Sequence, residues 1–280
     1  MNAATTDRGA GAGFVWVERA GMRWLAPKRP DWPSHAVVGF ATRAGGASQG
    51  IYGGLNLGMG SGDAVEIVMK NRIALGNAAG VPVNRWVVGG QVHGTTVATV
   101  GSNEAGRGGI DRTTTVKETD GLATSEPGLL LFTLVADCLP IVLADPDRPA
   151  LSTLHAGWRG SAAGMAAAGV RAMKEQFGSD PARLFAAIGP GIGGCCYQVG
   201  SEVTDQFRSE ESTPDREDPT KRRLDLSAAN ARMLAEAGVA PDRILRADLC
   251  TSCRADLFYS WRREKGQTGR QGSFAYLIPS

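Results

Sequence analysis

Residues 129–160 constrain the fold more than any other stretch of the chain. They read LLLFTLVADCLPIVLADPDRPALSTLHAGWRG and contain three apolar runs separated by polar turns. Runs of this length suit buried β-strands. Cys138 follows the first run and His155 ends the third, so neighbouring strands would hold a thiol and an imidazole rigidly beside an open cleft. That arrangement suits a metal site or a cysteine–histidine nucleophile equally well.

Strands and helices are expected on both sides of this stretch. Apolar patterning predicts strands or a hairpin at residues 14–25, 35–40, 86–90, 95–100, 184–188, 244–249 and 274–278. Helical spacing and end signals predict helices at residues 63–79, 161–177, 198–207 and 227–237, with Asp63 and Ser227 as N-caps. Polar composition predicts a mobile loop at residues 102–118 and an exposed loop at residues 208–223.

These elements predict an α/β (α+β) protein in which mixed β-sheets are flanked by helices. We expect one domain over residues 14–280, because no internal repeat and no convincing linker divides the chain. Residues 1–13 are small, polar and rich in Gly and Ala, without the apolar segment of a signal peptide. They are expected to form a disordered tail.

The composition narrows the class of protein. The 280 residues are 42% hydrophobic and 21% charged, with a net charge of +2, so nothing points to nucleic acid or a membrane surface as partner. No run of about 18 apolar residues predicts a membrane span. The cysteines number five, with two of them adjacent. That is a poor disulfide framework and is typical of the reducing cytoplasm, where we expect the protein to reside.

The three histidines limit the chemistry that the chain can perform. His93 and His155 each lie in a glycine-flanked turn after a predicted strand, whereas His35 precedes a strand with nothing reactive nearby. Together with Cys138, the first two would form a nitrogen–sulfur–nitrogen ligand set. Such a set suits zinc (Zn²⁺) with a fourth position open, as a catalytic zinc requires.

Two other patterns compete as ligand sites. The pair Cys250 and Cys253 forms a single C-x-x-C, which is weak evidence for zinc on its own. Cys195 and Cys196 are adjacent, and neighbouring side chains on a strand point to opposite faces, so all four cysteines are interpreted as structural. Residues 189–194 satisfy G-x-G-x-x-G, but no helix follows directly, which argues against dinucleotide binding.

Arginines and aromatic residues suggest a pocket for an anionic or flat ligand. Arg43 lies in a glycine-flanked turn and is either a solvated charge or an anion contact. Asn56 is by default a turn amide. Residues 258–263, FYSWRR, and residues 268–270, TGR, pair aromatic rings with guanidinium groups. They indicate either a strand with an exposed cationic side or a site for a nucleoside or phosphate.

Several motifs between about Phe40 and the C-terminus resemble, in order, the YfiH/laccase-domain family, which has also been called multicopper polyphenol oxidase. These motifs are QVHG at residues 91–94, ADC at 136–138, HAGWRG at 155–160, GPGI at 189–192, CY at 196–197, CT at 250–251, YSWRRE at 259–264 and TGR at 268–270. Two thiols, Cys195 and Cys253, are extra relative to the family pattern, and the last strand is less apolar than usual.

The resemblance implies the fold class grouped with cysteine-hydrolase-like toxins and a zinc ion held by His93, Cys138 and His155. It also implies phosphorolysis of purine nucleosides (adenosine, inosine, methylthioadenosine) together with adenosine deamination, in a monomer or weak homodimer. The residues expected to be catalytic are Asp137, Cys138 and Arg43. Those expected to bind substrate are Asn56, Gln91, Arg159, Arg262 and Arg270.

In this mechanism, a zinc-activated water positioned by Asp137 would attack the purine at C6, and arginines such as Arg43 would hold phosphate near the ribose C1′ carbon. One alternative is a metal-free hydrolase with Cys138 as nucleophile and His155 as base. A non-catalytic nucleoside sensor, which would tolerate loss of Cys138, is another.

A copper-dependent polyphenol oxidase is disfavoured. It would need a mononuclear and a trinuclear copper site built mostly from imidazoles, and three histidines cannot supply them. A single copper ion could still occupy the zinc site.

Overall fold

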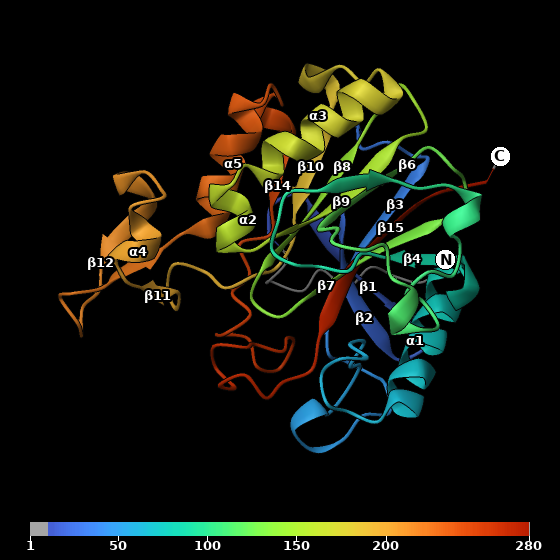
Figure 1. Ribbon diagram of the computed structural model, residues 1–280, viewed down its shortest axis with the longest axis horizontal. Helices are drawn as coiled ribbons and strands as arrows, with labels where there is room; N and C mark the ends of the chain where they lie inside the picture. Colours follow the sequence, from blue (N-terminus) through green and yellow to red (C-terminus); the bar gives the residue numbers. More distant parts are fainter. Residues whose placement is uncertain (1–10, 280) are drawn as a thin grey trace.

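Two six-stranded β-sheets packed face to face form the centre of the protein (Figure 1). The computed structural model describes residues 11–279. The first sheet has, in spatial order, β1 (Phe14–Arg19), β2 (Met22–Pro27), β3 (Ala36–Ala41), β15 (Gln271–Leu277), β7 (Leu130–Val135) and β4 (Trp86–Val88). The second has β14 (Ile244–Arg246), β10 (Phe185–Ile188), β8 (Leu139–Ala144), β9 (Leu151–Ala156), β6 (Gly121–Thr124) and β5 (Val97–Thr99).

Helices cover the outer faces of both sheets (Figure 1). Helix α1 (Val65–Ala79) buries Leu75 against Trp86 and Phe132 of the first sheet. Helices α3 (Met165–Phe177) and α5 (Leu226–Glu236) cover the second sheet. A separate apolar cluster fills the space between the sheets. The expected mixed α/β architecture is therefore confirmed, with the sheets enclosed between layers of helix.

The three apolar runs of residues 129–160 are the buried strands β7, β8 and β9, as predicted. Strand β7 belongs to the first sheet, and β8 and β9 belong to the second. Residues 136–138 alone connect β7 to β8, so the chain changes sheet within one tight turn. Asp137 in this turn has a φ of 85°, a left-handed conformation that non-glycine residues rarely adopt.

The chain departs from the predicted helices in two places. The helix expected over residues 161–177 is divided into α2 (Trp158–Ala162) and α3, because Gly164 between them has a φ of 92°. The helix expected over residues 198–207 is wrong in part: residues Gln198–Val199 form strand β11, and only the short helix α4 (Ser201–Thr204) lies within the predicted range.

The predicted exposed loop at residues 208–223 is also wrong in part. It contains β12 (Ser212–Pro214) and the start of β13 (Arg222–Leu224), and β13 pairs with both β11 and β12 in a three-stranded sheet. Polar contacts hold this sheet, including an ion pair between Arg223 and Asp215 at 2.6 Å. Strands whose side chains are mainly polar have no apolar pattern from which they could be predicted.

Both predicted N-caps are displaced. Helix α1 is capped at Ala64, and the Asp63 carboxylate instead accepts hydrogen bonds from the Ser48 and Asn56 side chains. Helix α5 is capped by Asp225, whose carboxylate accepts a hydrogen bond from the Ala228 N–H at 2.9 Å.

Three further expectations concern the loop at residues 102–118, the N-terminal tail and the absence of a membrane span. The loop at residues 102–118 contains two 3-10 turns and is hydrogen-bonded to β4. Most of the predicted disordered tail, residues 1–10, lies outside the described residues. Within residues 11–279, no helix has the length and apolar character needed to cross a bilayer.

Candidate active site

The ends of four strands bring His93, Cys138 and His155 together. Strands β4 and β7 are parallel, so the loop with His93 and the turn with Cys138 leave the sheet at the same end. Strand β9 runs antiparallel to β8, which places His155 opposite Pro140, beside Cys138. The Cys138 Sγ lies 3.9 Å from His93 Nε2, and the ligand atoms of all three residues lie within 4.8 Å of one another.

A glycine makes room for this cluster. A Cβ atom at Gly157 would lie 2.9 Å from Cys138 Sγ and 3.0 Å from His93 Cδ2. Any side chain at this position would push the thiol and the imidazole apart, which explains why glycine follows His155 so closely in the sequence.

Asp120, which the sequence did not single out, holds the cluster in place. Its carboxylate accepts hydrogen bonds from the backbone N–H groups of Val92, His93 and Gly94 at 2.8–3.0 Å. It also lies 2.8 Å from His155 Nδ1. This contact leaves the Nε2 atom of His155 free to face the cluster. A lone aspartate before a strand carries no pattern that distinguishes such a role.

The three residues fit a metal ion by their donor chemistry. Two imidazole nitrogens and one thiol are ligands that zinc and copper both accept. Metal-binding histidines almost always donate their second N–H to a carboxylate or carbonyl, and the His155–Asp120 pair has this arrangement. The identity of the metal does not follow from these contacts.

Charges within the cluster strongly shift the pKa values of Cys138 and His155. Burial raises the pKa of the Cys138 thiol, but His155 and His93 outweigh burial and lower this pKa to about 6. Burial lowers the pKa of His155, but the Cys138 thiolate and Asp120 raise it to about 9. In the absence of metal, the pair is therefore a thiolate and an imidazolium at neutral pH.

The cluster opens into a cavity of about 770 Å³. Five arginines line this cavity: Arg72, Arg112, Arg159, Arg262 and Arg270. Aromatic rings lie beside three of them, with guanidinium-to-ring distances of 4.4 Å for Arg159 and Trp158, 5.2 Å for Arg262 and Tyr197, and 4.9 Å for Arg270 and Trp261. The cavity therefore combines positive charge with flat apolar surfaces.

Of the predicted substrate-binding residues, Gln91, Arg159, Arg262 and Arg270 line the cavity. The Gln91 amide is engaged at both ends, because it donates to the Leu134 carbonyl and accepts from the Leu134 N–H. It thus ties the loop that carries His93 to β7. Asn56 is fully buried and does not line the cavity; its side-chain amide oxygen accepts a hydrogen bond from the Arg270 backbone N–H at 2.8 Å.

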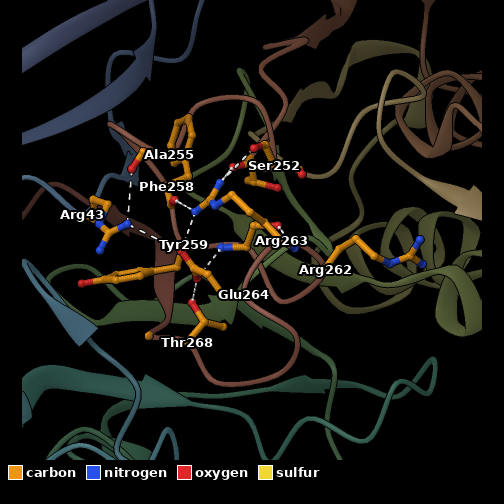
Figure 2. Close-up of polar contacts among 12 residues, drawn as sticks. Arg43, Ser252, Ala255, Phe258, Tyr259, Arg262, Arg263, Glu264 and Thr268 are labelled. Atoms are coloured by element: carbon orange, nitrogen blue, oxygen red, sulfur yellow. Dashed lines mark hydrogen bonds and ion pairs between the residues drawn. The ribbon is translucent and has the colours of Figure 1, made fainter. Parts of the chain in front are cut away.

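Arg43 is not among the residues that line the cavity. Figure 2 shows its side chain directed toward the Ala255 carbonyl, and its other donors bind the Gly53 carbonyl. Its guanidinium also lies over the Tyr259 ring and 3.6 Å from Glu264. This placement gives Arg43 a role in holding the C-terminal segment and offers no support for the expected phosphate contact.

Asp137 lies in the wall of the cavity with both carboxylate oxygens engaged. One accepts a hydrogen bond from Thr251 Oγ1 at 2.6 Å and the other from the backbone N–H of Arg262 at 2.7 Å. These bonds connect the turn before Cys138 to two segments from the C-terminal part of the chain.

Sequence reasoning also missed Arg72, Arg112 and Tyr197 as parts of the cavity. Arg72 is 1% exposed and donates to the carbonyls of Leu57, Gly108 and Gly109. In the sequence it is indistinguishable from a residue of the buried face of a helix.

The sequence and the fold both match known proteins. The family described as multi-copper polyphenol oxidoreductase laccase matches residues 37–278. The chain is 40% identical over 256 residues to purine nucleoside phosphorylase YlmD of Geobacillus stearothermophilus. This match covers 90% of this chain and 93% of the relative. Identity to purine nucleoside phosphorylase YfiH of Escherichia coli is 32%, over 89% of this chain and 98% of the relative. The crystal structure of YlmD from G. stearothermophilus matches with a TM-score of 0.88 at 37% identity, and the match covers 94% and 99% of the two chains.

Replacing Asp120 tests the support for the cluster. We expect Asp120→Asn to weaken metal binding about 10- to 100-fold, because the orienting carboxylate of His155 is lost. Competition with a chelator of known affinity measures the change. Asp145→Asn is the matched control, since Asp145 is also buried and accepts backbone N–H bonds but lies at the opposite end of β8. Equal affinity in both variants would show that Asp120 does not orient a ligand.

The pKa values predict the reactivity of the metal-stripped protein. Alkylation of Cys138 should reach half its maximal rate near pH 6, because the thiolate is the reactive form. His155→Gln should move this midpoint upward, since the neighbouring positive charge is removed. Mass spectrometry of labelled peptides resolves the five cysteines, and Cys195, whose pKa is raised by burial and by neighbouring thiols, is an internal control. Parallel pH profiles for both cysteines would contradict the thiolate–imidazolium pair.

Proposed function

The chain belongs to the family described as multi-copper polyphenol oxidoreductase laccase, and from that premise we propose that it is a zinc-dependent purine nucleoside phosphorylase. It would convert adenosine, inosine or methylthioadenosine and phosphate to the free base and the corresponding ribose 1-phosphate. One observation carries the proposal: three arginine–aromatic pairs line the cavity that contains the His–Cys–His cluster. The names of the relatives support an enzyme of this kind.

The cavity suits both substrates. Its volume of about 770 Å³ falls in the usual range for small-molecule sites. The rings of Trp158, Tyr197 and Trp261 offer faces on which a purine can stack. Guanidinium groups bind phosphate with paired, charge-assisted hydrogen bonds. A phenol, in contrast, would gain little from five cationic side chains.

The available donors suggest which arginines bind phosphate. Within the described residues, Arg112 and Arg159 have exposed guanidinium groups with neither a hydrogen bond nor an ion pair. Arg262 donates to the Gln198 carbonyl, and Arg270 donates to the carbonyls of Thr268 and Gly269. We therefore assign the phosphate contact to Arg112 and Arg159, and a positioning role to the other two.

The departing base needs a hydrogen-bond donor, and Tyr197 is suited to this role. Burial raises the pKa of Tyr197 to about 12, so its hydroxyl stays protonated at neutral pH and can donate to the purine. A zinc ion held by His93, Cys138 and His155 would supply a Lewis acid in the same cavity. Asp120 would keep His155 in the neutral tautomer that a metal requires.

We also propose that the cavity deaminates adenosine, as the motif resemblance implies. Asp137 was expected to position the attacking water, but hydrogen bonds from Thr251 and Arg262 occupy its oxygens. We therefore give Asp137 a positioning role in both reactions. The cytoplasmic location and the monomeric or weakly dimeric state stay predictions from the sequence.

A metal-free hydrolase is the second candidate, and the pKa of Cys138 near 6 favours it. The same thiolate–imidazolium pair serves nucleophilic catalysis in cysteine hydrolases. The two candidates differ in their need for phosphate and for metal, which makes them separable.

Cys138→Ser tests the metal-centred proposal. We expect the variant to lose one zinc ion per chain and to cleave adenosine with phosphate roughly 100-fold more slowly, or worse. Losing a residue that only hydrogen-bonds a metal ligand costs about 10- to 100-fold, and losing a residue that binds the metal itself should cost more. Elemental analysis of freshly purified protein and chromatography of released adenine measure both. A wild type whose cleavage needs neither phosphate nor metal, and which a thiol reagent inactivates, would instead favour the hydrolase.

Arg159→Met tests the phosphate contact. Losing a charged hydrogen bond worth about 1.5–3 kcal/mol should raise the KM for phosphate at least about tenfold. The KM for adenosine should change less. Arg171→Met, on the outer side of α3, is the control for loss of one positive charge. An unchanged KM for phosphate would remove Arg159 from the site.

A further inference from the structure

A second group of metal ligands lies outside the His–Cys–His cluster. It consists of Cys195 and Cys196, in the loop between β10 and β11, and Cys250 and Cys253, in the segment after β14. The four sulfur atoms lie within 4.8 Å of one another, although more than 50 residues separate the two pairs along the chain. All four thiols are free.

The spacing of the sulfurs suits one tetrahedral ion. With Zn–S bonds of about 2.3 Å, the sulfurs of a tetrahedral zinc site lie about 3.8 Å apart. Here the Cys253 sulfur is 3.4 Å from both the Cys195 and Cys196 sulfurs, and no pair exceeds 4.8 Å. The two adjacent thiols can point the same way because they lie in a turn, not in the strand assumed from the sequence.

The backbone around the sulfurs is shaped to receive them. The Gly193 N–H donates to Cys250 Sγ at 3.3 Å, and such bonds stabilise a thiolate. Gly193 also leaves space, since a Cβ atom there would lie 3.3 Å from Cys250 Cβ and 3.4 Å from Cys195 Sγ. Arg223, which is ion-paired with Asp215, also donates to the Cys195 carbonyl and so holds the turn that carries Cys195 and Cys196.

We propose that Cys195, Cys196, Cys250 and Cys253 bind a structural zinc ion. Four thiolates select zinc over the harder cations, and a closed tetrahedral set without an open position is typical of a structural site. The ion is thus separate from the one proposed at His93, Cys138 and His155, and it takes no part in the chemistry.

This ion would fasten a segment of the cavity wall to a second segment that supports the turn before Cys138. The first segment contributes Ile192 and Tyr197 to the lining. The second does not line the cavity, but its Thr251 hydroxyl donates a hydrogen bond to Asp137, next to Cys138. Arg263 also holds the second segment, by donating to the carbonyls of Thr251, Ser252 and Phe258, as Figure 2 shows for the last two. The zinc would therefore position Tyr197 and Asp137 from a distance.

Metal counting tests the proposal on the full chain, purified with reductant. We expect about two zinc ions per wild-type chain, one in Cys138→Ser and one in Cys253→Ser. Ser252→Ala is the matched control, because it changes the residue between two ligands without removing a sulfur, and it should keep both ions. A wild type with at most one ion, lost entirely in Cys138→Ser, would overturn the proposal. Iron in place of zinc would overturn the assignment of the metal.

A spectroscopic measurement covers the case in which Cys253→Ser fails to fold. Cobalt is added to metal-stripped Cys138→Ser protein, which retains only the four clustered thiols. An intense thiolate-to-cobalt charge-transfer band, with the visible bands of tetrahedral cobalt, is expected. Absence of this band contradicts the site. So does an intact mass that is lower by two hydrogens without reductant, because it would show that the thiols form a disulfide instead.

Discussion

The candidate site depends on one topological constraint, the short connection between β7 and β8. These strands lie in different sheets, yet only residues 136–138 separate them. The four residue steps from Val135 to Leu139 span at most about 14 Å, little more than the usual spacing of about 10 Å between two packed sheets. The connection is therefore nearly as short as it can be and must lie at the open edge of the sandwich. This explains the left-handed conformation of Asp137. It also places Cys138 at the edge where β4, β7 and β9 end and β8 begins.

A buried carboxylate then sets the electrostatics of that edge. Burial opposes ionisation of Asp120, but hydrogen bonds from His155 and from backbone N–H groups outweigh it and lower its pKa. The negative charges of Cys138 and Asp120 raise the pKa of His155, and the resulting imidazolium lowers the pKa of Cys138. A divalent cation would replace the proton on His155 and neutralise the same thiolate and carboxylate. Thiolate–imidazolium chemistry and metal binding are therefore alternative ways to balance one set of charges, which is why the sequence left both open.

The parts of the fold that apolar patterns encode could be predicted from the sequence, and the parts encoded by polar contacts could not. Residues 129–160 gave three buried strands, and the turns around His93, Cys138 and His155 do converge. The helix expected at residues 198–207 is shorter than predicted because Gln198 and Val199 pair with Arg223 and Arg222 of β13, a strand whose side chains bind the polar residues Ser212 and Asp215. Asp120 and the four clustered cysteines act through partners far away in the sequence, which no local pattern reveals. Arg43, chosen for its glycine-rich turn, uses its donors on backbone carbonyls instead.

The number and positions of the histidines also argue against multi-copper oxidase chemistry in this chain, despite the family's description. A multi-copper oxidase passes electrons between several copper ions held mainly by imidazoles. Two of the three histidines are in the cluster, and the third, His35, contacts the Asp145 carbonyl at 2.9 Å. Asp145 follows the last residue of β8, whereas Cys138 precedes the first, so seven residue steps, roughly 23 Å along the strand, separate Cys138 from the residue that His35 contacts. His35 cannot complete a second imidazole site at the cluster. What surrounds the cluster is a cavity with five arginines and three aromatic rings, which suits a phosphate and a purine better than the transfer of electrons from a phenol.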